Sequence, residues 1–241
     1  MSLPHILGED EVLTPRARDF IDRVATRAPL AWDPEEDAAA RLSVSRFFPA
    51  VDADAFFASV KILRHRFGGL RYRSLSPHIL CELEFCFIPE ISPGDVEPIV
   101  WMADFDDPFD SLGIWITTDG GVHYSCSGSD DRSRVRVFNS VYSLIESDAL
   151  HEQSASWHRV GHGGDENCNE VRLKAESMAR VVEASGSTES WWETGGVRVH
   201  LNFTGREVYR QKFHTSWSIW VDGDRGNAEA LRIFGHDLLT S

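Results

Sequence analysis

Lysine is the scarcest charged residue in this sequence. Only Lys61, Lys174 and Lys212 occur among the 24 basic residues, against 38 acidic residues, and the formal net charge is −14. A surface of this sign repels the phosphate backbone of nucleic acids and anionic membranes. We therefore expect neither nucleic acid nor a membrane as a partner, and basic proteins are the partners that such a surface favours.

Cysteines are also few, and long hydrophobic runs are missing. Cys81, Cys86, Cys126 and Cys168 include no CxxC pair of the kind that binds zinc, so we expect free thiols, no metal site and no cofactor. No apolar run approaches the length of a membrane span, and the chain does not open on a basic region followed by an apolar core. These absences predict a cytoplasmic protein.

The most unusual absence lies between Ser74 and Asp131, where neither lysine nor arginine occurs. Acidic residues are frequent over the same span. They are Glu82, Glu84, Glu90, Asp95, Glu97, Asp104, Asp106, Asp107, Asp110, Asp119, Asp130 and Asp131. Such a separation of charge predicts a strongly negative region of the surface.

Three interpretations of the acidic centre, WMADFDDPFDS, stay open: a solvated loop, a surface for a basic protein partner, or a hard-cation site. The cation site would use Asp104, Asp106 and Asp110, but the segment lacks the glycine and closing glutamate of an EF-hand loop. A partner surface would use phenylalanine rings as apolar anchors in an acidic field. Of the two functional interpretations we favour the partner surface, formed by Asp104, Phe105, Asp106, Asp107, Phe109 and Asp110.

What the chain does contain is enough apolar residues for a core, since 42% are hydrophobic and eight are tryptophan. Thr14 followed by Pro15 predicts a helix start, and Asp52 or Asp54 predicts another that ends at Gly68-Gly69. Apolar spacing also predicts a helix after Asp33-Pro34 and further helices over 138–150 and 169–185.

Alternating or short apolar runs predict strands near residues 78–88, 97–103, 111–117, 121–127, 197–203 and 211–223. We therefore predict an α+β fold with a mixed or mostly antiparallel sheet flanked by helices, and a C-terminal α/β extension. The predicted parts are a loose arm (1–13), an α+β domain (14–150), a polar Gly/His loop (151–168) and the extension (169–241).

Four features of the first part carry a resemblance to a known family. They are a helix running into RFGGLRY, a hairpin GIWITTDGGVHYSCSG, a helix FNSVYSLIESDAL just after it, and the order helix, strands, hairpin, helix. Over residues 15–150 the chain resembles the SUKH superfamily, small α+β proteins many of which are immunity proteins of bacterial toxin systems. The resemblance implies a binding module with no catalytic residues to carry over, and it does not account for residues 165–241.

The hairpin tip TTDGGVHYSCSGSD brings a histidine close to a serine and a cysteine. On a strand His123 and Ser125 share one face and Cys126 takes the other, so only the serine could meet the histidine. No Gly-x-Ser-x-Gly elbow surrounds Ser125. We therefore interpret Asp119 and the two glycines after it as a tight turn and not as part of a nucleophile site.

Two further segments allow a different function. WHRVGHGGDENC holds His158, His162 and Asp165, which could serve a hydrolase or transferase together with His200 or His214. Trp191 and Trp192 could form an exposed platform, although adjacent tryptophans more often split between core and surface. Our leading hypothesis is a non-catalytic, immunity-like protein that neutralises a basic partner through its acidic face; the enzyme is the alternative.

Overall fold

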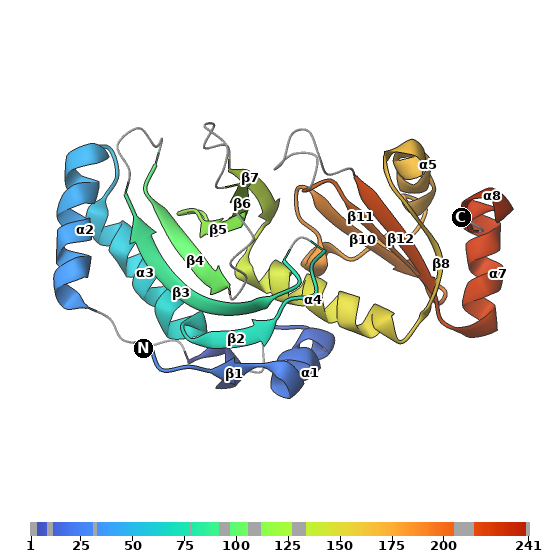
Figure 1. Ribbon diagram of the computed structural model, residues 1–241, viewed down its shortest axis with the longest axis horizontal. Coiled ribbons are helices and arrows are strands. Elements are labelled where there is room, and N and C mark those ends of the chain that lie inside the picture. The colour runs from blue at the N-terminus through green and yellow to red at the C-terminus, as the bar shows by residue number, and fades with distance from the viewer. Residues whose placement is uncertain are drawn as a thin grey trace.

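Two antiparallel sheets lie on either side of one long helix in the computed structural model (Figure 1). The structure describes residues 4–8, 12–30, 33–77, 79–91, 97–105, 112–126, 134–204 and 215–239. This arrangement confirms the predicted α+β fold. None of the helices in these ranges has the length and hydrophobicity that crossing a membrane requires.

The first sheet is a meander of seven strands, each paired with the next along the chain. One face forms the larger core, with Leu83, Phe85, Ile114 and Tyr124 fully buried. Its strands are β1 (Thr26–Arg27), β2 (Leu70–Arg73), β3 (Glu82–Glu90), β4 (Ile99–Phe105), β5 (Leu112–Ile116), β6 (Val122–Cys126) and β7 (Val135–Phe138).

The N-terminal helices begin at the predicted caps. The Thr14 hydroxyl accepts a hydrogen bond from the amide of Ala17, and the Asp52 carboxylate accepts from two amides of its first turn. A short 3-10 helix, η1 (Ile6–Gly8), precedes them. The helices are α1 (Pro15–Val24), α2 (Pro34–Phe47) and α3 (Ala53–Phe67).

Helix α4 (Val141–Ala155) is buried from both sides. It begins later than predicted, because Phe138 still belongs to β7 and Ser140 caps the helix. Asp148, fully buried in α4, accepts hydrogen bonds from the Tyr72 and Ser74 hydroxyls at 2.9 Å. Its carboxylate also accepts from two amides just after β2, so it ties α4 to the first sheet.

The second sheet has the strand order β8-β12-β11-β10-β9 and turns one apolar face to the C-terminal helices. Its elements are β8 (His158–Gly163), α5 (Asp165–Ala175), β9 (Ala179–Arg180), η2 (Val182–Ala184), β10 (Glu189–Thr194), β11 (Val197–Asn202), β12 (Ser216–Val221), α7 (Gly223–Phe234) and α8 (His236–Leu239). The opposite face meets α4.

Residues 151–168 differ from the predicted polar loop. They contain the end of α4, the edge strand β8 and the start of α5. The glycines that suggested a loop are packing positions: a Cβ on Gly163 would come within 2.7 Å of the Trp217 ring, and one on Gly161 within 2.7 Å of the Leu238 carbonyl oxygen. Glycine here admits a large ring and does not loosen the chain.

Two other expectations need correction. The N-terminal arm is not loose where it is described, because Ile6 is fully buried in the core and the His5 ring lies 3.3 Å from the Gly68 carbonyl oxygen. The segment around Trp191, where no strand was predicted, is strand β10. Its hairpin to β11 closes at Gly195-Gly196, both with positive φ, as a type I′ turn requires.

Candidate functional site

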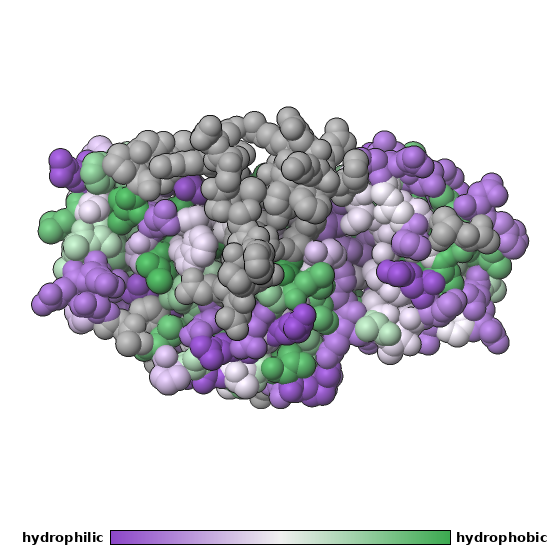
Figure 2. All heavy atoms as spheres, viewed as in Figure 1, coloured by the Kyte–Doolittle hydropathy of each residue, from purple (hydrophilic) through white to green (hydrophobic). Residues whose placement is uncertain are grey.

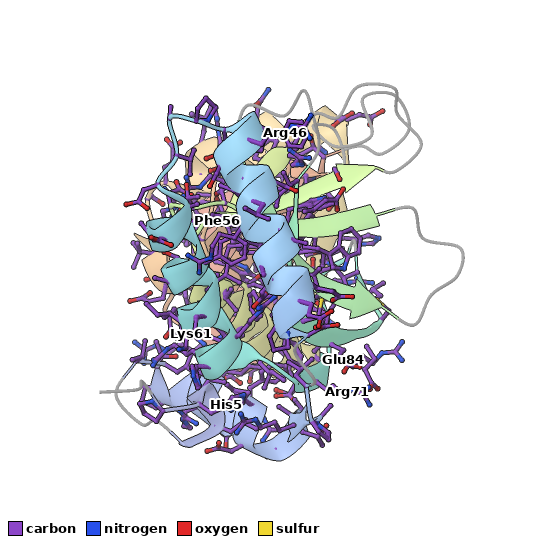
Figure 3. The ribbon with its side chains drawn as sticks, turned by 90° about the vertical axis from the view of Figure 1, so that its left-hand side faces the viewer. His5, Arg46, Phe56, Lys61, Arg71 and Glu84 are labelled. Carbon is purple, nitrogen blue, oxygen red and sulfur yellow. The ribbon has the colours of Figure 1, made fainter. Side chains whose placement is uncertain are left out.

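The span without lysine or arginine supplies four neighbouring strands, β3 to β6, of the first sheet. Of the acidic residues that the structure describes, Glu82, Glu84 and Glu90 are on β3, Asp104 is near the end of β4 and Asp119 is in the turn between β5 and β6. Among the described residues, three cations reach these strands from the flanking elements: Arg71 of β2 pairs with Glu84, Arg136 of β7 pairs with Asp119 at 2.5 Å, and Arg134, just before β7, lies over the Trp115 ring. In Figure 3, Arg71 and Glu84 lie together at the edge of the molecule.

An aromatic pair lies on the face of this sheet that points away from the core, which we call the outer face. Trp101 of β4 and Trp115 of β5 are opposite each other in register, with ring centroids 4.7 Å apart in an edge-to-face arrangement. The Trp115 indole donates to the Ser125 hydroxyl at 2.7 Å, and the Arg134 guanidinium lies over its ring. The centre of the outer face is thus aromatic, with Trp101 half-buried and Trp115 8% exposed, and the charge beside it is that of Arg134.

Gly113 is what allows this pair to form. A Cβ at this position would lie 2.6 Å from the Trp115 indole nitrogen and 3.1 Å from the Trp101 ring. The two rings therefore occupy the space over Gly113, two residues before Trp115 on β5, where any other residue would place its Cβ. We expected Trp101 and Trp115 only as strand residues, because the sequence does not give the register that places them side by side.

The hairpin between β5 and β6 is the predicted turn. The Asp119 carboxylate accepts from the Thr117 hydroxyl at 2.6 Å and from the Gly121 amide at 3.0 Å, and Gly120 has a φ of 84°. These hydrogen bonds, with the Arg136 guanidinium, lower the pKa of Asp119 to about 2. Each carboxylate contact therefore supports the turn.

His123 and Ser125 do not form a nucleophile pair. Ser125 accepts from Trp115, and the His123 ring nitrogen lies 3.3 Å from the Thr117 hydroxyl. Burial, followed by the charge of Arg136, lowers the pKa of His123, so this imidazole is neutral at pH 7. Of Cys126, only the backbone lies within the described residues.

The predicted partner-binding residues are only partly described. Asp104 and Phe105 end β4, where Asp104 is in register with Glu84 and Phe105 with Leu83. The other four, Asp106, Asp107, Phe109 and Asp110, lie outside the described residues. The predicted partner surface therefore begins at the end of β4, where Asp104 lies beside Glu84 of β3.

His158, His162 and Asp165 are not brought together as a catalytic set. A bulge in β8 places His158 in register with Val221 and His162 with Ser218. Val221 belongs to the apolar core beside the C-terminal helices and Ser218 alternates away from it, so the two histidines face opposite sides of the sheet. Asp165 begins α5 and accepts from the Thr215 amide at 2.9 Å.

A different histidine cluster is buried between α4 and the second sheet. Of its two histidines, the sequence had indicated only His200. The rings of His151 and His200 lie 4.7 Å apart, and Trp191 stacks on His200 at 4.2 Å. Glu189, fully buried, binds the His200 ring, and the Thr204 hydroxyl donates to its other oxygen. Burial, then the charges of His200 and Arg198, holds the pKa of His151 well below its usual value.

The tryptophan pair beside this cluster is split between two buried environments. Trp191 faces α4 and donates to the Ser147 hydroxyl at 3.0 Å, whereas Trp192 belongs to the core beneath α5 and α7. Neither ring forms an exposed platform, because their exposed fractions are 0% and 6%.

No group of three or more histidine, cysteine or acidic side chains suited to a metal ion occurs in the described ranges. Comparison of the chain with family models, curated proteins and solved structures gave no match. The resemblance to the SUKH superfamily therefore stays a prediction.

Proposed function

We propose that this chain is a non-catalytic binding protein that holds a basic protein partner on the outer face of its first sheet. The observation that carries the proposal is the gathering of β3 to β6, all from the span without lysine or arginine, around the Trp101–Trp115 pair. Interfaces in which a few residues dominate affinity are enriched in tryptophan at the centre and polar residues at the rim.

Charge supports the same proposal at longer range. A net charge of −14 attracts a basic protein and speeds its encounter, and the carboxylates of β3, the end of β4 and the β5–β6 turn direct the encounter to the first sheet. Phe105, at the end of β4, is in register with the buried Leu83 and so lies on the core side of the sheet, which leaves Phe109, outside the described residues, as the candidate apolar anchor. An immunity-like protein that neutralises a basic toxin fits these features, as the family resemblance implies.

Stoichiometry distinguishes binding from catalysis. A partner captured from the source cell is identified and purified, and its activity is titrated with the chain. We expect complete neutralisation at one equivalent of the chain. Below one equivalent, only the fraction of the partner that is bound should be inactive. If a small fraction of an equivalent silences the partner irreversibly, the chain acts as an enzyme and the proposal fails.

Association kinetics locate the surface. Reversing Asp104, Asp106 and Asp107 to lysine should slow association about tenfold at low salt, because long-range attraction sets the encounter rate. A matched variant with the same change of charge elsewhere reverses the exposed acids Glu183, Asp224 and Asp237, which lie on η2, α7 and α8. Equal slowing in both variants would show that only net charge matters and that the outer face is not the binding surface.

An enzyme is the second candidate, and the Glu189–His200 pair is the observation that favours it. A carboxylate that orients an imidazole is a common arrangement for general base catalysis. However, both side chains are at most 4% exposed and are packed against Trp191. His200→Gln should therefore leave neutralisation of the partner at one equivalent; loss of neutralisation in a folded His200→Gln protein would favour the enzyme.

A further inference from the structure

A second site lies at the other end of the molecule, between α2, α3 and the segment that follows β1. A cavity of about 810 Å³ opens there, lined by Arg27, Ala28, Pro29, Leu30, Pro34, Asp37, Arg41, Phe57, Lys61, Arg64, His65 and Gly68. Figure 1 shows α2 and α3 at the far left, away from the second sheet. We call this cavity the basic groove.

The sign of the basic groove is opposite to that of the protein. Five of its lining side chains are arginine, lysine or histidine and only Asp37 is acidic, although acidic residues outnumber lysine and arginine 38 to 24 in the chain. Asp37 does not offset the other cations, because Arg64 engages both of its oxygens at 2.6 and 2.8 Å. An excess of positive charge therefore remains in the groove.

Two of the cations are fixed by contacts inside the protein. The Arg64 guanidinium donates to the Phe87 carbonyl oxygen as well as to Asp37, and thereby holds α2 beside β3. Arg41 pairs with Asp54, and its guanidinium lies 4.9 Å from the centre of the Phe57 ring. These contacts keep the groove open, since they support its walls without filling it.

Three other basic side chains have no ion pair or hydrogen bond within the described part of the chain. Lys61 and His65 are exposed on α3, four residues apart and thus on the same side of the helix, and Arg27 is exposed at the end of β1. Figure 3 shows Lys61 on α3, with α2 crossing in front of the sheet. The charges of Lys61 and Arg27 and the imidazole N–H of His65 are available to a ligand.

The groove also has an apolar part. Pro29, Leu30 and Phe57 line it beside the cations, and α2 leaves space because only Val44 of that helix is buried. Figure 2 shows hydrophobic residues between hydrophilic ones at this left end of the molecule. A ligand with both an anionic group and an apolar body matches such a lining.

We propose that the basic groove binds a small organic anion, with its phosphate or carboxylate held by Arg27, Lys61 and His65 and its apolar body against Leu30 and Phe57. The volume lies within the roughly 300–1,000 Å³ of small-molecule sites. A mixed lining, with several charges and an apolar part, is typical of such sites and gives the anion its orientation. This site is separate from the proposed protein-binding face and takes a ligand of opposite charge.

The test uses 1-naphthyl phosphate, 1-naphthoate and neutral 1-naphthol as probes, with binding measured by calorimetry on the full chain. We expect the two anions to bind at least about tenfold more tightly than the neutral probe, and their order shows whether phosphate or carboxylate is preferred. Equal binding of 1-naphthol, or no binding of either anion at millimolar concentration, would overturn the proposal. Binding of a hexaglutamate peptide with no binding of the naphthyl anions would also overturn it, in favour of an acidic protein segment.

Variants locate the site. Lys61→Gln should weaken the anions about tenfold and leave 1-naphthol unchanged. The matched control is Arg46→Gln, a cation at the far end of α2 that does not line the groove (Figure 3). Both substitutions are on exposed positions, so a thermal melt checks that both variants fold. Equal weakening by Arg46→Gln would show that the anions respond to net charge and not to the groove.

Discussion

The two sheets of this protein treat polar residues in opposite ways. The first sheet leaves its charged residues on an outer face, where Glu82 and Glu90 are exposed and Glu84 pairs with Arg71 near the surface. The second sheet is covered on both faces, and every residue of β11 is buried. Polar groups can stay in such a place only when a partner meets each of them.

Arg198 shows how the second sheet meets this demand. Its guanidinium donates to Glu193 at 2.8 Å, to the Ser154 hydroxyl at 3.0 Å and to the Gln153 side chain at 2.8 Å, and it lies 4.2 Å from the centre of the Trp157 ring. Partners from β10, from α4 and from the turn after α4 surround one cation. The comparison teaches that charged residues of the second sheet are buried among several internal partners, whereas those of the first sheet lie near the surface.

The largest expected effect on stability is at Glu189 in the second sheet. Replacing Glu189 with alanine should lower the free energy of unfolding by about 3–5 kcal/mol, because it leaves the buried His200 without its partner. Glu84→Ala, at the half-exposed pair of the first sheet, should cost less than about 1 kcal/mol. Urea unfolding of both variants measures the difference, and similar costs would refute the contrast.

A double variant sharpens the same comparison. Glu189→Leu combined with His200→Leu should recover most of the loss, because a buried pair replaced by apolar groups leaves nothing unsatisfied. The corresponding energies come from the same urea experiment. A double variant as unstable as Glu189→Ala would mean that the pair itself, and not the stranded partner, provides the stability.

A smaller effect concerns the buried carboxylate of Asp148. Burial outweighs its four hydrogen bonds and raises its pKa to about 6 from an ordinary 3.8. Between these values the folded state binds more protons than the unfolded state, so this residue lowers stability as pH rises from about 4 to 6, by roughly 3 kcal/mol in total. Carboxyl NMR titration gives the pKa; a value near 4 would contradict this prediction.

Asp119 on the exposed hairpin has the opposite sign. Its pKa of about 2 means that it stabilises the fold above pH 4 and that this contribution is lost as pH falls towards 2. The Asp119→Asn variant should therefore lack part of the acid-induced loss of stability seen in the parent protein between pH 4 and 2. Identical acid unfolding of the two proteins would refute it.

The glycines of the two sheets differ in the same way. Gly163→Ala should cost about 1–3 kcal/mol, because the methyl group meets the buried Trp217 ring. Gly120→Val should cost about 1 kcal/mol, from strain at a positive φ with open space around it. Thermal melts of both variants give the order, and a reversed order would contradict the packing role of Gly163.

The smallest effect on stability is expected on the acidic region. Reversing Asp104, Asp106 and Asp107 to lysine should change the free energy of unfolding by less than about 0.5 kcal/mol, since solvated charges contribute little. Phe109→Ala should instead speed dissociation of a bound partner. A triple variant that fails to fold would show that these carboxylates are structural.

Local chemistry explains what the sequence predicted well. The caps at Thr14 and Asp52 and the turn at Asp119 depend on contacts within three residues, so residue identity is sufficient to predict them. The apolar face of α3, which buries Phe56, Phe57, Val60 and Phe67, follows in the same way from helical periodicity. These elements were predicted in place, with errors of a few residues at their ends.

Long-range pairing explains what was missed. The separation of His158 and His162 predicts one shared face, but the bulge in β8 reverses it. Trp101 and Trp115 meet because of strand register, and His151 meets His200 across an interval of 49 residues. No pattern within a few residues of the sequence predicts these contacts.

Helix α4 has a consequence for how the molecule comes apart. Both halves of the molecule pack against this helix. On one side it contacts α1 and β7; on the other it contacts η2 and, through Trp191, β10. Removing either half would uncover an apolar helix face, as well as Asp148 or His151, to water. We therefore expect the two sheets to unfold as one cooperative unit, and fragments that end after β7 or begin at β8 not to fold alone.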